Sequence, residues 1–214
     1  MISIACSGFP IPASRYFREY GAVEIADTEL GLPGAGTMRR WLREAPDEFV
    51  FSVVAPKQIA GAGFSLDPGT QQAVSAVASF AKELGSRAVV FAASEAFSPS
   101  RAHRTRLRAF AEHIAGKIDR PVFDLATWSR KEALTALKDL PVCVAFDPLT
   151  EAPDAAEFAY ARMAGPSGYR SRYDAAALDR VVERCQNSAA EHTFVAFRNI
   201  DRYENSKYVQ AKLR

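Results

Sequence analysis

Short apolar runs recur along the chain, and most of them end at a polar or charged residue. The runs cover residues 2–5, 22–25, 49–54, 88–92, 121–125, 142–146, 158–163 and 193–197. Their length and their flanking turn residues predict eight buried strands. Helical patterns lie between most of them, and eight β/α units favour one (β/α)8 barrel of the TIM type. We therefore expect an α/β protein with a single domain over residues 1–214.

Cap residues mark several of the expected helices. Ser129 and Glu132 have the spacing of a capping box, Asp174 precedes another periodic stripe, and Ser98 followed by Pro99 predicts a third helix start. The segment between the sixth and seventh runs is short and rich in proline, so we expect one outer helix to be missing after strand 6. An open doubly wound sheet remains an alternative, although residues 6–10 are not the glycine-rich turn usual in that fold.

The amino-acid composition and net charge disfavour some classes of binding partner. Of the 214 residues, 48% are hydrophobic and 24% charged, which is ordinary for a globular protein, and the net charge of +2 gives no bulk attraction to nucleic acid or membrane. No apolar run approaches the roughly 18 residues of a membrane span, and the N-terminus lacks a secretory pattern. The cysteines Cys6, Cys143 and Cys185 are odd in number and far apart. We therefore expect a cytoplasmic protein with reduced thiols.

Several segments resemble a known protein family. They are residues 6–12, Arg15-Tyr16-Phe17, Val23-Glu24-Ile25, residues 158–165 and Phe197-Arg198-Asn199. Together they resemble the short branch of the DUF72 family, which is also called YecE-like. The resemblance covers most of the chain and is weakest between about residues 60 and 120. It implies a TIM barrel, and it implies no particular reaction, because the biochemical role of that family is not established.

The departures from the family pattern fall at polar positions. Ala26 replaces an Asn, Val54 a Lys, Ala164 a His, and Arg198 the first Asn of a final pair. The resemblance therefore implies a divergent member. Both a working site and a degenerate site remain open.

The strand ends carry the candidate chemistry. Active sites of these barrels lie at the carboxyl ends of the strands. The candidate catalytic groups there are Glu24, Asp124 and Asp147. The candidate substrate-binding groups are Ser7, Lys57, Arg162, Tyr169, Tyr173 and Asn199. Carboxylates beside an arginine in a partly dry pocket are suited to acid–base chemistry, with Glu24 or Asp124 as the base. A purely structural ring of ion pairs is the alternative.

Arg162 lies inside an apolar strand, where a guanidinium needs an anionic partner. That partner is either an internal acid, such as Glu24 or Asp147, or the anion of a ligand. The two readings predict different effects of removing Arg162. An internal pair makes the change a stability defect, and a ligand contact makes it a binding defect.

No cofactor is expected. His103, His113 and His192 do not occupy strand ends, so a zinc site is disfavoured, and Mg²⁺ on Glu24, Asp124 and Asp147 is the minor alternative. The arginine-rich run 101–108 reads as a solvated helix face rather than a nucleic-acid patch. We expect a small-molecule ligand and no membrane partner, nucleic acid is disfavoured as a partner but stays open, and the sequence does not indicate an oligomeric state.

Three functions remain open on these grounds. The first is cofactor-independent acid–base chemistry on a small anionic or polyhydroxylated substrate. The second is a non-catalytic protein that binds a small ligand or associates with nucleic acid. The third is a metal-dependent phosphodiester hydrolase, which rests on fold analogy alone.

Overall fold

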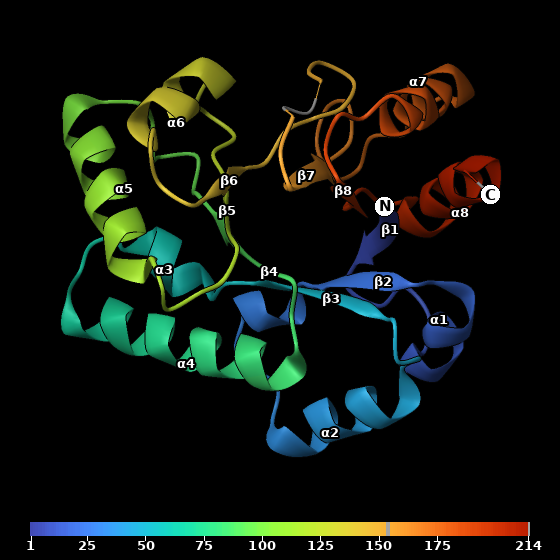
Figure 1. Cartoon of the computed structure of the whole chain (residues 1–214), viewed down its shortest axis with the longest axis horizontal. Helices are drawn as coiled ribbons and strands as arrows, with labels where there is room; N and C mark the ends of the chain where they lie inside the picture. Colours follow the sequence, from blue (N-terminus) through green and yellow to red (C-terminus); the bar gives the residue numbers. More distant parts are fainter. Residues whose placement is uncertain (153–154, 214) are drawn as a thin grey trace. The chain divides into compact units, whose positions relative to one another are not determined.

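The computed structural model describes residues 1–152 and 155–213 (Figure 1). Its strands are β1 (Ile2–Ser7), β2 (Ala22–Ile25), β3 (Val50–Val54), β4 (Ala88–Ala92), β5 (Pro121–Asp124), β6 (Cys143–Val144), β7 (Phe158–Met163) and β8 (His192–Phe197). Each lies at one of the eight apolar runs, and the strand order along the sheet is β6-β5-β4-β3-β2-β1-β8-β7. The strand pairs with a defined register are parallel. The predicted β/α alternation is therefore confirmed.

Helices alternate with the strands along the chain (Figure 1). They are α1 (Ala13–Glu19), α2 (Ala35–Glu44), α3 (Lys57–Gly61), α4 (Pro68–Leu84), α5 (Arg101–Ile114), α6 (Arg130–Ala136), α7 (Ala175–Gln186) and α8 (Arg202–Leu213), with a 3-10 turn η1 (Asp27–Glu29) after β2. Between β6 and β7 the described residues form turns and bends without a helix, as the proline-rich segment predicts; Pro153 and Asp154 lie outside the described residues. No helix in the described part of the chain is both long and apolar enough to cross a bilayer.

The helix caps test the sequence prediction residue by residue. Ser129 and Glu132 form the capping box at α6, and Asp174 caps α7 by accepting a hydrogen bond from the Ala177 N–H at 2.7 Å. The predicted start at Ser98-Pro99 is wrong, because α5 begins at Arg101 with Ser100 as its cap. The backbone at Phe97 is held outside the helix, since its carbonyl accepts the indole N–H of Trp128 at 2.6 Å.

The described chain divides into two compact units. Unit 1 comprises Met1–Glu24, Arg43–Val50 and Ala145–Arg214, and unit 2 comprises Ile25–Leu42 and Phe51–Val144. Each unit has an apolar core of its own. The single-domain boundary of residues 1–214 therefore stays a prediction.

In unit 1 the core lies between strands β1, β7 and β8 and helices α7 and α8. It is formed by alternate residues of each strand, such as Ala161 and Met163 on β7 and Val195 and Phe197 on β8, each fully buried. Because side chains alternate between the two faces of a strand, the intervening residues face the opposite side of the sheet. Arg162 and Ala196 belong to that opposite face, which positions the candidate site.

The core of unit 2 contains a cluster of aromatic rings. Phe64, Phe91, Phe110 and Phe123 are buried, and their ring centroids lie 4.9–6.3 Å from neighbouring rings. Rings at these separations and at the observed edge-on and offset angles attract one another beyond simple burial. These rings therefore pack β4 and β5 against α5 and the turn after α3 within unit 2.

Candidate functional site

A buried ion pair lies at the strand ends of unit 1. Glu24 on β2 is fully buried, and the Arg162 side chain on β7 is 2% exposed. Arg162 Nε donates to Glu24 Oε2 at 2.9 Å, and Arg162 Nη2 donates to Oε1 at 3.0 Å. This two-pronged contact uses both oxygens of the carboxylate. Of the two partners considered for Arg162, the structure shows the internal acid.

The pair spans two intervening strands. Since β1 and β8 lie between β2 and β7 in the strand order, Glu24 and Arg162 would start about 14 Å apart in a flat sheet. Their side chains meet because the sheet curves and because small residues on the two intervening strands leave room between them. Ala5, Ala196 and Arg162 are in register, and both alanines are fully buried. The register of Ser7 with Glu24 places Ser7 on the same face.

Two further hydroxyl groups complete the carboxylate's hydrogen bonds. The Tyr160 hydroxyl donates to Glu24 Oε2 at 2.9 Å, and its ring stacks on Phe194 with centroids 4.8 Å apart. The hydroxyl of Ser7 also hydrogen-bonds to the Glu24 side chain. Sequence reasoning missed Tyr160, although its position two residues before Arg162 places both on one face of β7.

The electrostatics hold Glu24 in its charged form. Burial alone would raise the pKa of Glu24, but the positive charges of Arg162 and Arg198 and the hydrogen bonds from Arg162 and Ser7 outweigh burial and lower it. A carboxylate with a lowered pKa and four donors is a weak base. The geometry therefore favours Glu24 as the fixed floor of a site rather than as its proton acceptor.

Asp147 has a different environment, in the turn after β6. One of its carboxylate oxygens accepts a hydrogen bond from the Leu149 N–H at 2.9 Å, and burial raises the pKa of Asp147. Its negative charge also acts on Tyr173, whose pKa burial raises to about 12. The Tyr173 hydroxyl accepts the Gly165 N–H at 2.7 Å, which fixes the ring beside the end of β7. The raised pKa of Asp147 suits proton transfer.

The remaining candidates in unit 1 organise the loops. Asn199 is fully buried, donates to the Ser171 carbonyl at 3.2 Å and accepts from Asn205 at 3.2 Å, so its amide links the loop after β7 to α8. The Tyr169 side chain is 56% exposed, while its carbonyl accepts the Ile200 N–H at 2.7 Å. These contacts favour Asn199 as a positioning group and leave Tyr169 accessible to a ligand.

Two predicted residues lie in unit 2. Asp124 ends β5 and is partly buried, and its carbonyl accepts the Ala93 N–H at 2.8 Å. Lys57 is exposed and begins α3, directly after β3 and the turn at Pro56. The convergence of Asp124 and Lys57 with the groups of unit 1 stays a prediction.

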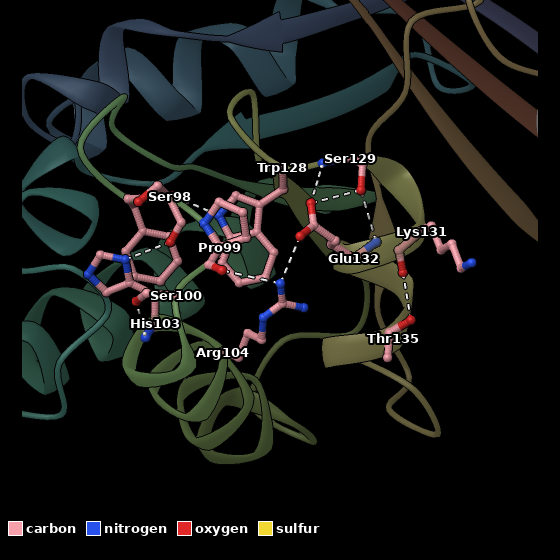
Figure 2. Close-up of polar contacts among 11 residues, drawn as sticks. Ser98, Pro99, Ser100, His103, Arg104, Trp128, Ser129, Lys131, Glu132 and Thr135 are labelled. Atoms are coloured by element: carbon pink, nitrogen blue, oxygen red, sulfur yellow. Dashed lines mark hydrogen bonds and ion pairs between the residues drawn. The ribbon is translucent and has the colours of Figure 1, made fainter.

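The segments after β4 and β5 form an aromatic clasp, which we define as Phe97, His103, Arg104, Trp128 and Glu132. Figure 2 labels the last four of these residues. Phe97 stacks between His103 and Trp128, at centroid distances of 4.4 and 5.8 Å. Arg104 lies 5.6 Å from the centroid of the Trp128 ring and pairs with Glu132 at 2.7 Å. The imidazole of His103 also contacts the Ser98 carbonyl at 2.7 Å, so this histidine has a structural use.

The described residues contain no group of three or more His, Cys, Asp or Glu side chains that could hold a metal ion. In particular, Glu24 has Arg162, Tyr160 and Ser7 around its carboxylate and no second acid among its described hydrogen-bond partners. The geometry gives no support to a Mg²⁺ site on Glu24 and Asp147.

Solved structures share this fold at low sequence identity. A DUF72 family protein from Enterococcus faecalis V583 matches with a TM-score of 0.81 at 14% identity, over 100% of this chain and 95% of that one. One from Thermotoga maritima MSB8 matches with a TM-score of 0.72 at 17% identity, over 100% and 99%. D-psicose 3-epimerase from Clostridium cellulolyticum H10, solved with D-tagatose, matches with a TM-score of 0.61 at 11% identity, over 98% and 93%.

These likenesses and the eight parallel strands with alternating helices show a (β/α)8 fold of the TIM-barrel type. A comparison with curated proteins gives no significant match. A family model described as "Protein of unknown function DUF72" matches residues 13–214, so the chain belongs to the DUF72 family.

Proposed function

We propose that this protein binds a small anionic or polyhydroxylated molecule at the carboxyl ends of β1, β2, β7 and β8. The observation that carries the proposal is the buried Glu24–Arg162 pair at those ends. A buried ion pair gains little stability over an apolar pair of the same volume, because both charges lose their hydration. Its presence at the usual site position of a TIM barrel is therefore better explained by a ligand site built upon it.

The ligand would meet the groups that extend beyond this pair. Ser7 and Arg198 are partly exposed and adjoin Glu24, one through a hydrogen bond and the other through its charge. A hydroxyl and a guanidinium side by side recognise carboxylate, phosphate and vicinal diol groups. One structural neighbour holds D-tagatose, which adds ketoses to the candidates on fold analogy alone.

A thermal-shift screen tests this proposal. Pentoses, hexoses, hydroxy acids and sugar phosphates are added to the wild type, to Ser7→Ala and to Arg198→Gln. Arg180→Gln, which removes an exposed arginine from α7 of the same unit, is the matched control. We expect one of these ligands to raise the melting temperature of the wild type and of the control. Its affinity for the Ser7 and Arg198 variants should be about tenfold lower, because each variant loses one charge-assisted contact. A ligand that stabilises all four proteins equally would bind elsewhere.

Acid–base catalysis by Asp147 is a second candidate, favoured by the raised pKa of its half-buried carboxyl group. The test is deuterium exchange from D2O into a ligand found by the screen, followed by proton NMR in the wild type and in Asp147→Asn. Asn can accept the same Leu149 hydrogen bond and keeps the turn. We expect binding to persist and exchange to fall by about a hundredfold or more, the usual effect of losing a general base. Unchanged exchange in Asp147→Asn would remove the catalytic role.

A further inference from the structure

Arg202 differs from the arginines of unit 1 that pair with an acid. It begins α8, and its buried Nε–H has no hydrogen-bond partner in the described part of the chain. The hydrogen bond of its guanidinium runs from Nη1 to the Tyr169 hydroxyl at 3.4 Å, the outer limit of such a contact. By contrast, Arg162 pairs with Glu24, and Arg172 pairs with Asp201 at 3.3 Å. Arg202 has no acid partner among the described residues.

A buried donor on a charged group is costly when it has no acceptor. An unsatisfied buried polar group destabilises the folded state, and more so when the group is charged. Native structures therefore supply such groups with an acceptor from the protein, from water or from a ligand. A guanidinium is planar and always charged, and its Nε and Nη groups match two oxygens of one anion.

The surroundings of Arg202 are fixed in place. The loop after β7 turns at Gly165 and Gly168, with φ of +100° and +92°, and a Cβ at Gly165 would clash with the Gly168 carbonyl oxygen. Within it, Ser171 Oγ accepts the Ser167 N–H at 2.9 Å. The Tyr169 carbonyl accepts the Ile200 N–H, which ties this loop to the segment that leads into α8. Tyr169 is thus held beside Arg202 before any ligand arrives.

The segments before Arg202 and after β7 carry further arginines. Arg170 is exposed in the loop after β7, Arg198 follows β8, and Asp201 is already paired with Arg172. The loops after strands 7 and 8 are also where TIM barrels frequently bind phosphate. A dianion therefore fits the local charge better than a monoanion does.

We propose that Arg202 and the Tyr169 hydroxyl bind a phosphoryl group, so that the ligand is a phosphorylated small molecule. This inference rests on the proposed function and names the class of its ligand. The long Tyr169 contact can yield to a phosphoryl oxygen, because it is weak. The phosphoryl oxygens then accept from the phenol and from the Arg202 guanidinium, whose buried Nε–H turns toward the ligand as it binds.

The experiment titrates the full chain with inorganic phosphate, with sodium chloride adjusted to constant ionic strength and acetate as the comparison anion. Binding is followed by amide shifts in proton–nitrogen NMR spectra. We expect saturable shifts at Tyr169, Ile200 and Arg202 with phosphate, and weaker ones with acetate. Arg202→Gln should weaken phosphate binding about tenfold, and Arg202→Lys by a smaller factor, because Lys keeps the charge and loses the fork. Arg180→Gln, the matched control, should stay within about twofold.

Equal phosphate affinity in Arg202→Gln and the wild type would overturn the inference, as would shifts that do not saturate or that fall elsewhere. If Arg202→Gln fails to fold, Tyr169→Phe takes its place, because this change removes a hydroxyl from an exposed residue. Tyr169→Phe should also weaken phosphate binding measurably. Polyols that bind through Ser7 and Arg198 without any phosphate response would refute the phosphoryl site alone. Phosphate that binds through Arg202, while no ligand in the screen depends on Ser7 or Arg198, would refute the proposed function alone.

Discussion

The strand ends of unit 1 and unit 2 are filled by opposite chemistry. In unit 1 the ends of β2 and β7 meet in a charged pair, with exposed fractions of 0% and 2% for Glu24 and Arg162. In unit 2 the ends of β4 and β5 are covered by the aromatic clasp, whose ion pair between Arg104 and Glu132 is 37% and 35% exposed. The strand ends thus bury a charged pair in unit 1 and stacked rings in unit 2.

The difference shows in which unit a bound anion would interact most strongly with the protein. Charges in a dry setting interact strongly with one another and with any new anion, because water does not screen them. Stacked apolar rings such as Phe97 and Trp128 carry no charge with which an anion could interact in this way. We therefore expect mutations to report on charge in unit 1 and on packing in unit 2.

The largest expected effect is that of Arg162→Ala. It leaves the Glu24 carboxylate buried without its main partner, so we expect the free energy of unfolding to fall by about 3–5 kcal/mol in urea titrations. The double variant Glu24→Leu, Arg162→Met should lose much less than the sum of the two single changes. Additive losses in that double-mutant cycle would show that the two side chains are not coupled.

The next effect is the pH dependence of the same pair. Because the pKa of Glu24 is lowered in the folded state, its contribution is complete above its ordinary value of 4.5 and is lost as the pH falls through the folded pKa. We expect Glu24→Gln to be less stable than the wild type near pH 7, and the gap to narrow below about pH 4.5. Urea titrations from pH 7 to pH 3 measure it, and parallel curves would contradict the assignment.

A smaller effect is expected in unit 2 from Phe97→Leu. The change keeps an apolar side chain but removes the stacking on His103 and Trp128, so we expect a loss of about 1–2 kcal/mol. The loss should be nearly independent of salt. A marked salt dependence would mean that charge, rather than ring packing, holds the clasp together.

The smallest effect is that of Arg104→Gln. Its ion pair with Glu132 is a third exposed and its guanidinium lies over Trp128, so removing the charge should cost at most about 1 kcal/mol. A loss as large as that of Arg162→Ala would erase the contrast between the two regions.

The strand positions could be predicted because they depend on local apolar patterning. The capping box at Ser129 and the cap at Asp174 could also be predicted, since a cap depends on residues within one turn. The start of α5 could not, because the contact between Phe97 and Trp128 that holds the preceding segment out of the helix joins residues 31 apart in sequence.

The site was predicted in part for the same reason. The sequence placed Glu24 and Arg162 at strand ends, and it could not choose between an internal acid and a ligand anion. That choice depends on a contact over 138 residues. Tyr160 could not be identified from the sequence because a tyrosine in an apolar strand resembles an ordinary core residue. Arg202 could not be identified because a sequence does not show which donors lack an acceptor.

The two alanines on the strands between Glu24 and Arg162 have a consequence for how this protein could change over evolution. Ala5 and Ala196 bring no bulk to their level of the sheet, so the floor of the site is made by the tips of Glu24 and Arg162. The shape and polarity of that floor can therefore be redrawn by exchanging two side chains, while the strands keep their register. A shorter pair would deepen the site and a neutral pair would suit uncharged ligands. This protein can accordingly serve as a scaffold whose ligand preference is redesigned without rebuilding its backbone.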